Sequence, residues 1–220
     1  MSSLPGAPRA RRAALVSFDP GNPAAGVIAF QYNPAQLRRT LAPQYATDGA
    51  ASETLRITGP PRESIALDAE FDAADQPGQP GVTGVGVGLH PQLAALEVLL
   101  YPKAATVLRN AVLSRLGVIE VLAPEAPLTV LVWGTKRVVP VRLTGFSVSE
   151  DAHDLDLNPT LATVSLSLDV LTYQDLPATS LGYGLSVAHQ LAKEAMAAAG
   201  GVAAASRLAA LSPSLRPLTG

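Results

Sequence analysis

The stretch LATVSLSLDVLTY, residues 161–173, alternates apolar and polar side chains along most of its length. The apolar members fall on one side of an extended chain: Ala162, Val164, Leu166, Leu168 and Val170. The polar members fall on the other side: Thr163, Ser165, Ser167 and Asp169. Because successive side chains of a β-strand point to opposite faces, this period of two predicts a half-buried strand. A protein core should therefore lie against the even-numbered face.

The same period recurs earlier in the chain, at residues 63–72. One face carries the apolar residues Ile65, Leu67, Ala69 and Phe71. The other face carries Ser64, Asp68, Glu70 and Asp72, interrupted only by Ala66. Shorter or less regular runs predict five further strands, at residues 13–18, 27–32, 37–43, 128–133 and 138–149. Residues 128–133 are almost wholly apolar, which is typical of a strand covered on both sides.

The segment 138–149 changes the side on which its large apolar residues fall. Val139, Val141 and Leu143 share one parity, whereas Phe146 and Val148 have the other. An extra residue in one strand of an antiparallel pair produces such a change. We therefore expect a β-bulge at Thr144-Gly145.

Helical signals lie between and after the strands. Leucines at positions 89, 93, 96 and 100 are spaced by four, three and four, which predicts one helix, and a second piece is expected from Thr106 to Leu116. Residues 185–211 are rich in alanine and predict a C-terminal helix, with a break expected at Gly200-Gly201. Residues 46–62, which end in Gly59-Pro60-Pro61, and residues 73–88 are expected to be loops.

The predicted fold class is mainly β with α (α+β). We expect an antiparallel β-sandwich or barrel with one packed helix, plus the C-terminal alanine-rich helix. Three regions follow from the pattern: a flexible arm at 1–11, a β-barrel domain at 12–177, and a helical extension with a tail at 178–220.

The composition narrows the functional class. The chain has 220 residues, of which 48% are hydrophobic and 15% charged, with a net charge of −2. The charged fraction is below the roughly 25% usual in soluble domains, which indicates either coverage by neighbouring subunits or an alanine bias. Without a basic face, no nucleic-acid partner is expected. No apolar run approaches the roughly 20 residues of a membrane helix, so no membrane insertion is expected.

Two further absences bear on the cellular location. Cysteine is absent, which excludes disulfides and thiol catalysis and fits a cytoplasmic protein. The apolar run that follows Arg9, Arg11 and Arg12 ends at Ser17, and it is shorter than the roughly 7–15 apolar residues of a signal peptide. No export signal is therefore expected.

Two segments carry residue types that can bind ligands. Gly84-Val85-Gly86-Val87-Gly88 lacks the G-x-G-x-x-G spacing and the preceding strand of a dinucleotide site, so we interpret it as a loop. Residues 150–158 (EDAHDLDLN) resemble a calcium loop only superficially. With Asp154 as the first ligand, Pro159 occupies the position that requires glycine. A solvated connection between two strands is expected instead.

No catalytic pattern appears elsewhere. His90, His153 and His189 lie in separate segments, without an H-E-x-x-H or G-x-S-x-G motif. We predict no catalytic, cofactor-binding or metal-binding residues, and no enzyme activity. Trp133, the sole tryptophan, is interpreted as a core residue, with an interface anchor as the alternative. Asn33-Pro34 predicts a hairpin-like corner between the runs 27–32 and 35–41, because proline excludes the preceding residue from helical geometry.

Four segments, in this order, resemble the tube domain of contractile injection system proteins. They are FQYNP at 30–34, the alternating strand at 65–71, PLTVLVWG at 127–134 with the strand 138–150, and PTLATVSLSLDVLTY at 159–173. Members of that family share an F-x-[YF]-N-P corner, a P-x-x-x-x-x-W-G strand, and a final strand after an acidic, turn-rich loop. The resemblance extends over residues 12–175.

The resemblance implies a structural subunit at the junction of tube and baseplate. Such proteins form six-membered rings that stack into, or initiate, the inner tube of a phage-tail-like particle. The expected partners are further copies in a hexameric ring, the inner tube protein, the baseplate hub and spike protein, and other baseplate subunits. The expected location is the cytoplasm of the producing cell, within an assembled particle.

Two points qualify this expectation. Some baseplate members carry a C-terminal LysM module, which the alanine-rich sequence after Pro177 does not resemble. A tube initiator or adaptor without that module is therefore expected. The alternative function is a monomeric β-barrel binding module, in which the Gly-rich loop 76–88 closes over a small ligand.

Overall fold

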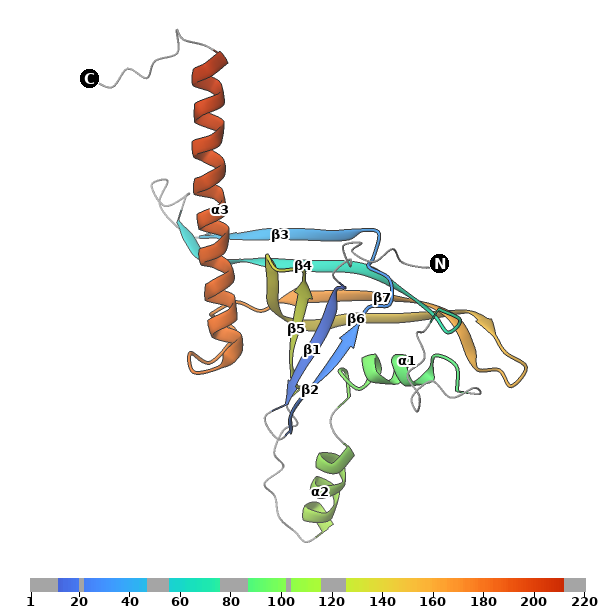
Figure 1. The fold of residues 1–220 in the computed structure, drawn as a ribbon. Helices are drawn as coiled ribbons and strands as arrows, with labels where there is room; N and C mark the ends of the chain where they lie inside the picture. Colours follow the sequence, from blue (N-terminus) through green and yellow to red (C-terminus); the bar gives the residue numbers. More distant parts are fainter. Residues whose placement is uncertain are drawn as a thin grey trace.

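A single antiparallel sheet forms the body of the protein in the computed structural model, which describes residues 12–19, 22–46, 56–75, 87–101, 104–115 and 126–211. The strands are β1 (Ala14–Asp19), β2 (Asn22–Ala29), β3 (Leu37–Tyr45), β4 (Ile57–Asp72), β5 (Leu128–Trp133), β6 (Arg137–His153) and β7 (Pro159–Val170). The helices are α1 (His90–Glu97), α2 (Ala104–Arg115) and α3 (Leu181–Leu211). The strand order is β2-β1-β5-β6-β7-β4-β3 (Figure 1).

The mainly-β class with helices is confirmed, and the sheet is one layer that does not close. The expected sandwich or closed barrel is therefore not formed. Among the described residues, β2 and β3 are the two edge strands of the sheet. Strand β6 joins two parts of the sheet, because it pairs with β5 through residues 137–141 and with β7 from Val141 onward. Its pairing with β7 shifts register between Leu143 and Gly145, which confirms the expected bulge and allows the strand to bend.

The sheet is strongly curled, as the corner after β2 demonstrates. The backbone N–H of Phe30 donates to the carbonyl of Ala13 beside β1, and the side chain of Gln31 exchanges two hydrogen bonds with the backbone of Asp72 in β4. In a flat sheet, β1 and β4 would be four strand spacings apart, about 19 Å. Two consecutive residues bridge them, so the sheet folds around its core.

The corner itself is not a hairpin, contrary to the sequence-based interpretation. Strands β2 and β3 lie at opposite edges, and residues 30–36 cross between them. The contacts of the corner explain the route: Phe30 is fully buried, and the side-chain oxygen of Asn33 accepts a hydrogen bond from the backbone of Ala13 at 2.8 Å. Long-range anchoring therefore replaces the local strand pairing that a hairpin would make.

The hydrophobic core fills the inner face of the curl, with the parity that the sequence predicts. Ile65, Leu67, Ala69 and Phe71 of β4 and Ala162, Val164, Leu166 and Leu168 of β7 are all at most 3% exposed. In β5, the neighbouring residues Val130 and Leu131 point to opposite sides and are both buried, as expected for a strand covered on both faces. These strands therefore lie at the centre of the packed body.

Helix α1 covers one end of this core. Leu89, Leu93, Leu96 and Leu99 are buried, whereas Leu100, which the helical spacing had assigned to the stripe, is 44% exposed. The helix ends at Glu97, so the period of 3.6 no longer applies to the last leucine. Helix α2 lies apart from the sheet (Figure 1), and none of its residues is buried.

Several boundaries differ from the sequence-based expectation. Strand β2 covers Asn22–Ala29 where a strand at 27–32 was expected, and β6 extends to His153. Strand β4 begins at Ile57, and therefore includes Gly59-Pro60-Pro61 where a loop was expected. Register shifts between Ala42 and Tyr45 in the neighbouring edge strand accommodate these residues. Helix α3 begins at Leu181 and continues through Gly200-Gly201 without a break. The surrounding alanines, the strongest helix formers, offset the cost of the two glycines.

Replacing Gly88 with alanine should destabilise the fold, whereas the same change at Gly184 should stabilise it. Gly88 has φ of +55°, and a Cβ there would contact the carbonyl oxygen of Pro159 and lie 2.9 Å from the Cβ of Asn158. Strain of this kind costs about 1–3 kcal/mol. Gly184 lies in α3 with open space around it, so alanine should gain about 0.5–1 kcal/mol. Urea denaturation of both variants tests this, and equal effects would contradict it.

Candidate functional site

The outer face of four neighbouring strands is polar and rich in hydroxyl groups. Strand pairing aligns Ser64 of β4 with Asp169 of β7, Asp68 with Ser165, and Glu70 with Thr163. On the other side of β7, Ser147 and Ser149 of β6 lie beside Ser165 and Thr163. On β3, Thr40 lies beside Ser64. The alternation in the sequence thus builds a continuous polar surface across β3, β4, β7 and β6, named here the polar face.

Hydrogen bonds and one ion pair link neighbouring strands across the polar face. The hydroxyl of Ser165 donates to Asp68 at 2.6 Å, and that of Thr163 donates to Asp151 at 3.3 Å. The guanidinium of Arg142 lies 3.2 Å from the carboxylate of Asp169. Most of the side chains are short, and Thr40, Ser64, Arg142 and Asp169 also line an open hollow of about 590 Å³. The face is therefore suited to contact with water or solutes over a broad area.

Both edges of the sheet carry exposed apolar side chains. Val27 on β2 is 64% exposed, and Leu41 and Tyr45 on β3 are 47% and 50% exposed. An edge strand presents unpaired backbone donors and acceptors, which proteins normally protect with charges, prolines or bulges. Pro43 and the register shifts beside it interrupt the far end of β3. The stretch from Leu37 to Ala42 remains regularly paired on one side only.

A charged cluster joins α3 to the inner side of the sheet. The carboxylate of Glu63 is 6% exposed and lies 2.6 Å from the guanidinium of Arg39 on β3 and 3.2 Å from the amine of Lys193 on α3. Burial favours a higher pKa for Glu63, but the hydrogen bond from Arg39 and the charges of Lys193 and Arg39 outweigh it and lower the pKa overall. Glu63 is therefore ionised at neutral pH.

This cluster was not predicted from the sequence, although the sequence contains a signal for it. Glu63 has the same parity as Ile65 and Leu67, so it continues the buried face of β4. A carboxylate at a buried position requires a partner. The partners come from a strand 24 residues away and a helix 130 residues away, and sequence spacing alone does not connect them.

Only residues 154–158 form the expected connection between strands, because residues 150–153 belong to β6 and pair with β7. Asp154 accepts hydrogen bonds from the backbone of Asp156 and Asn158, each at 2.9 Å, and from the Asn158 amide. Hydrogen bonds from Asn158 lower the pKa of Asp154. The carboxylate thus closes a tight turn in which Leu157 has φ of +62°. Of the glycine-rich segment, residues 84–86 lie outside the described residues.

The three histidines occupy different settings. His90 is the exposed first residue of α1, His153 lies 3.2 Å from Glu150 at the end of β6, and His189 is partly buried on α3. In the part of the chain that the structure describes, no group of three or more His, Cys, Asp or Glu residues could hold a metal ion. Trp133 is partly buried and packs against the core cluster, in agreement with its interpretation as a core residue.

No protein-family model matches the chain, and no curated protein matches it. Among the described residues, none of the helices has the length and apolar character needed to cross a membrane. The function is therefore inferred from the chain's own surfaces.

Proposed function

We propose that the protein is a structural subunit of a contractile injection system, in which it forms a ring that joins the baseplate hub and spike to the inner tube. The observation that supports this most strongly is the polar face, which extends over four strands and ends at the regularly paired part of the edge strand β3. A wall of small hydroxyl and carboxylate side chains suits a water-filled lumen, because it offers hydrogen bonds to water over a broad area. The sequence resemblance supports the same assignment.

Assembly through the sheet edges accounts for their exposure. Strand β3 of one copy and strand β2 of the next are different surfaces, so their contact would be heterologous and would generate a ring when the rotation closes. Each copy would then satisfy the backbone groups left open at both edges. The exposed apolar residues Val27 and Leu41 would be covered in the same contact. The resemblance implies six copies.

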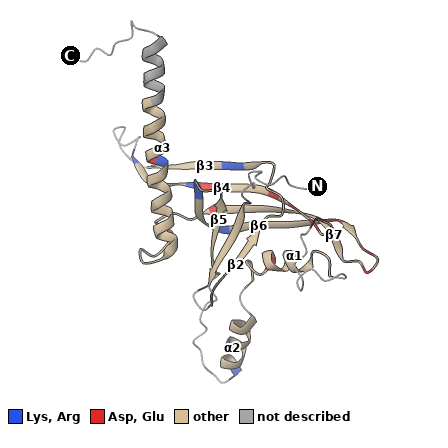
Figure 2. Ribbon diagram, in the orientation of Figure 1, with Lys and Arg blue, Asp and Glu red and all other residues tan. Residues whose placement is uncertain are grey.

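The uneven charge distribution supports different partners at the two ends of the sheet. Figure 2 shows acidic residues toward the tip of the β6–β7 hairpin and basic residues toward α3. The acidic end contains Glu70, Asp72, Glu150, Asp151, Asp154 and Asp156. Complementary charges guide and orient association. Contacts with the inner tube protein at one end and with the hub, spike or other baseplate subunits at the other are compatible with this polarity, within a particle assembled in the producing cell's cytoplasm.

The oligomeric state tests the proposal against a monomeric binding module. Light scattering coupled to size-exclusion chromatography, with the protein alone and co-expressed with the products of its neighbouring genes, should show an assembly whose mass is a multiple of the chain. Negative-stain electron microscopy should show rings. A strict monomer under all these conditions would exclude the ring.

Lysine at an exposed edge position should weaken assembly without unfolding the protein. Val27→Lys and Leu41→Lys each place a charge where a neighbouring strand would pair, the device by which natural edges avoid association. Leu155→Lys is the matched control, because Leu155 is fully exposed at the hairpin tip, away from both edges. We expect a shift toward monomer at least about tenfold larger than for the control, as unpaired or like charges at an interface cost more than 1.4 kcal/mol. Equal shifts for the three variants would refute assembly through the edges.

A further inference from the structure

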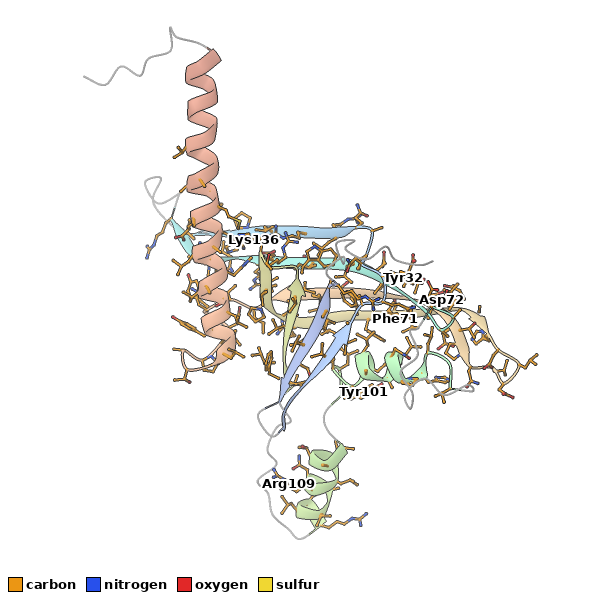
Figure 3. All side chains as sticks on the ribbon, in the orientation of Figure 1. Tyr32, Phe71, Asp72, Tyr101, Arg109 and Lys136 are labelled. Carbon is orange, nitrogen blue, oxygen red and sulfur yellow. The ribbon has the colours of Figure 1, made fainter. Side chains whose placement is uncertain are left out.

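A hollow between α3, the edge strand β3 and the turn that joins β5 to β6 is lined mainly by cationic side chains. It has a volume of about 310 Å³. Its lining includes Arg39, Trp133, Lys136, Arg137, His189 and Lys193. Figure 3 labels Lys136 at the β5–β6 turn, beside α3. Residues from three separate parts of the chain, β3, the β5–β6 hairpin and α3, thus meet at one place.

The charges around the hollow are unbalanced. Arg39 and Lys193 both pair with Glu63, and together they occupy both of its carboxylate oxygens. Lys136 and Arg137 form no ion pair with any residue that the structure describes. The lining therefore contains four cations against one neighbouring carboxylate. Glu194, the acidic residue of α3, does not line the hollow and instead accepts a hydrogen bond from Gln190.

The electrostatic environment of Arg137 is the one expected for a guanidinium that lacks a negatively charged partner. Burial, and then the charge of Arg39, lower the pKa of Arg137, against a smaller opposing effect of Glu63. His189 adds no further positive charge, because burial and the charge of Lys193 lower its pKa and favour the neutral imidazole. A partly buried guanidinium among other cations is stabilised when an anion binds beside it.

We propose that this hollow binds an oxyanion, the phosphate or carboxylate group of a ligand or partner, through Arg137 and Lys136, with Arg39 and Lys193 adding positive potential. Guanidinium groups bind such groups through two parallel hydrogen bonds, and a lysine adds a mobile point charge. Trp133 supplies an apolar wall that partly excludes water and strengthens these interactions. The site does not depend on the assembly proposed above, since every lining residue comes from one copy of the chain.

Calorimetric titration at constant ionic strength, with inorganic phosphate and with a hexaglutamate peptide as separate probes, tests the site. At least one probe should bind with a Kd on the order of 1 mM or tighter. Arg137→Gln should weaken that binding about tenfold or more, because it removes hydrogen bonds from a charged group to the anion. Lys136→Gln is the second variant, and its exposed position leaves the fold intact. Arg142→Gln removes an equal charge from the polar face and is the matched control.

The pattern of results decides the proposal and the source of the anion. Binding of phosphate alone, lost in Arg137→Gln and kept in Arg142→Gln, indicates a phosphate-bearing ligand. Preferential binding of the peptide indicates an acidic segment of a protein partner. Absence of binding by both probes, or equal weakening in Arg142→Gln and Arg137→Gln, would overturn the site. A monomer in light scattering would leave this result unchanged, so the two proposals fail separately.

Discussion

Leu166→Ala should lower the free energy of unfolding by about 2–5 kcal/mol, the usual cost of a leucine truncation in a rigid core. Leu166 is 1% exposed and lies in β7 between Leu67 of β4 and Phe146 of β6. The loss combines the transfer free energy of the removed methyl groups with a cavity that strands on both sides prevent from collapsing. Since native domains are stable by only about 5–15 kcal/mol, this one change removes a large part of the total.

Leu161→Ala provides the matched control, since it is the same substitution in the same strand. Leu161 is 40% exposed, so its truncation removes less buried surface and leaves no enclosed cavity. We expect a cost of about 1 kcal/mol or less. Urea denaturation followed by the fluorescence of Trp133, the only tryptophan, measures both variants at one fixed protein concentration. Equal costs for the two variants would mean that the core does not lie on the even-numbered face of β7.

Glu63→Gln should be the second strongly destabilising change, by up to about 3 kcal/mol. Removal of one member of a buried ion pair leaves its partner charge uncompensated, at a cost of roughly 3–5 kcal/mol. Arg39 and Lys193 are 29% and 37% exposed, so water reduces that cost here. Glu70→Gln, an exposed carboxylate on the same strand, is the control and should change stability by less than about 0.5 kcal/mol.

The pH dependence of stability identifies the charge as the cause. The pKa of Glu63 is lower in the folded protein than its ordinary value, so its stabilising contribution is complete above that ordinary value. The contribution is then lost as the pH falls through the folded pKa. Glu63→Gln should therefore show a flatter decline in stability between neutral and acidic pH than the wild type or Glu70→Gln. An unchanged pH profile would show that Glu63 does not stabilise the fold through its charge.

The period-two alternation of apolar and polar residues predicted the buried faces of the main strands. The buried and exposed sides of β4 and β7 and the bulge in β6 follow from local side-chain parity, because one face of each strand must leave water. The C-terminal helix was likewise predicted from its alanine content. Strand order was not predictable in this way, since pairing between distant segments leaves no periodic trace in either segment.

The sequence predicted more of the polar face than of the charged cluster at Glu63. The polar residues of β7 were recognised as one surface, and the structure adds their neighbours on β3, β4 and β6. The cluster at Glu63 was not recognised, because only folding brings Arg39 and Lys193 to it. The same holds for the hollow beside Arg137, which three separate parts of the chain enclose.

By itself, the sequence determined the β-rich class, the faces of the main strands and the terminal helix, all of which depend on the burial of neighbouring side chains. Tertiary structure alone decided that β2 and β3 become the two open edges, that residues 30–36 cross between them, and that α3 is held to the sheet by Glu63. These features depend on contacts between residues far apart in the chain. Their free energies arise only when the sheet curls and brings such residues together.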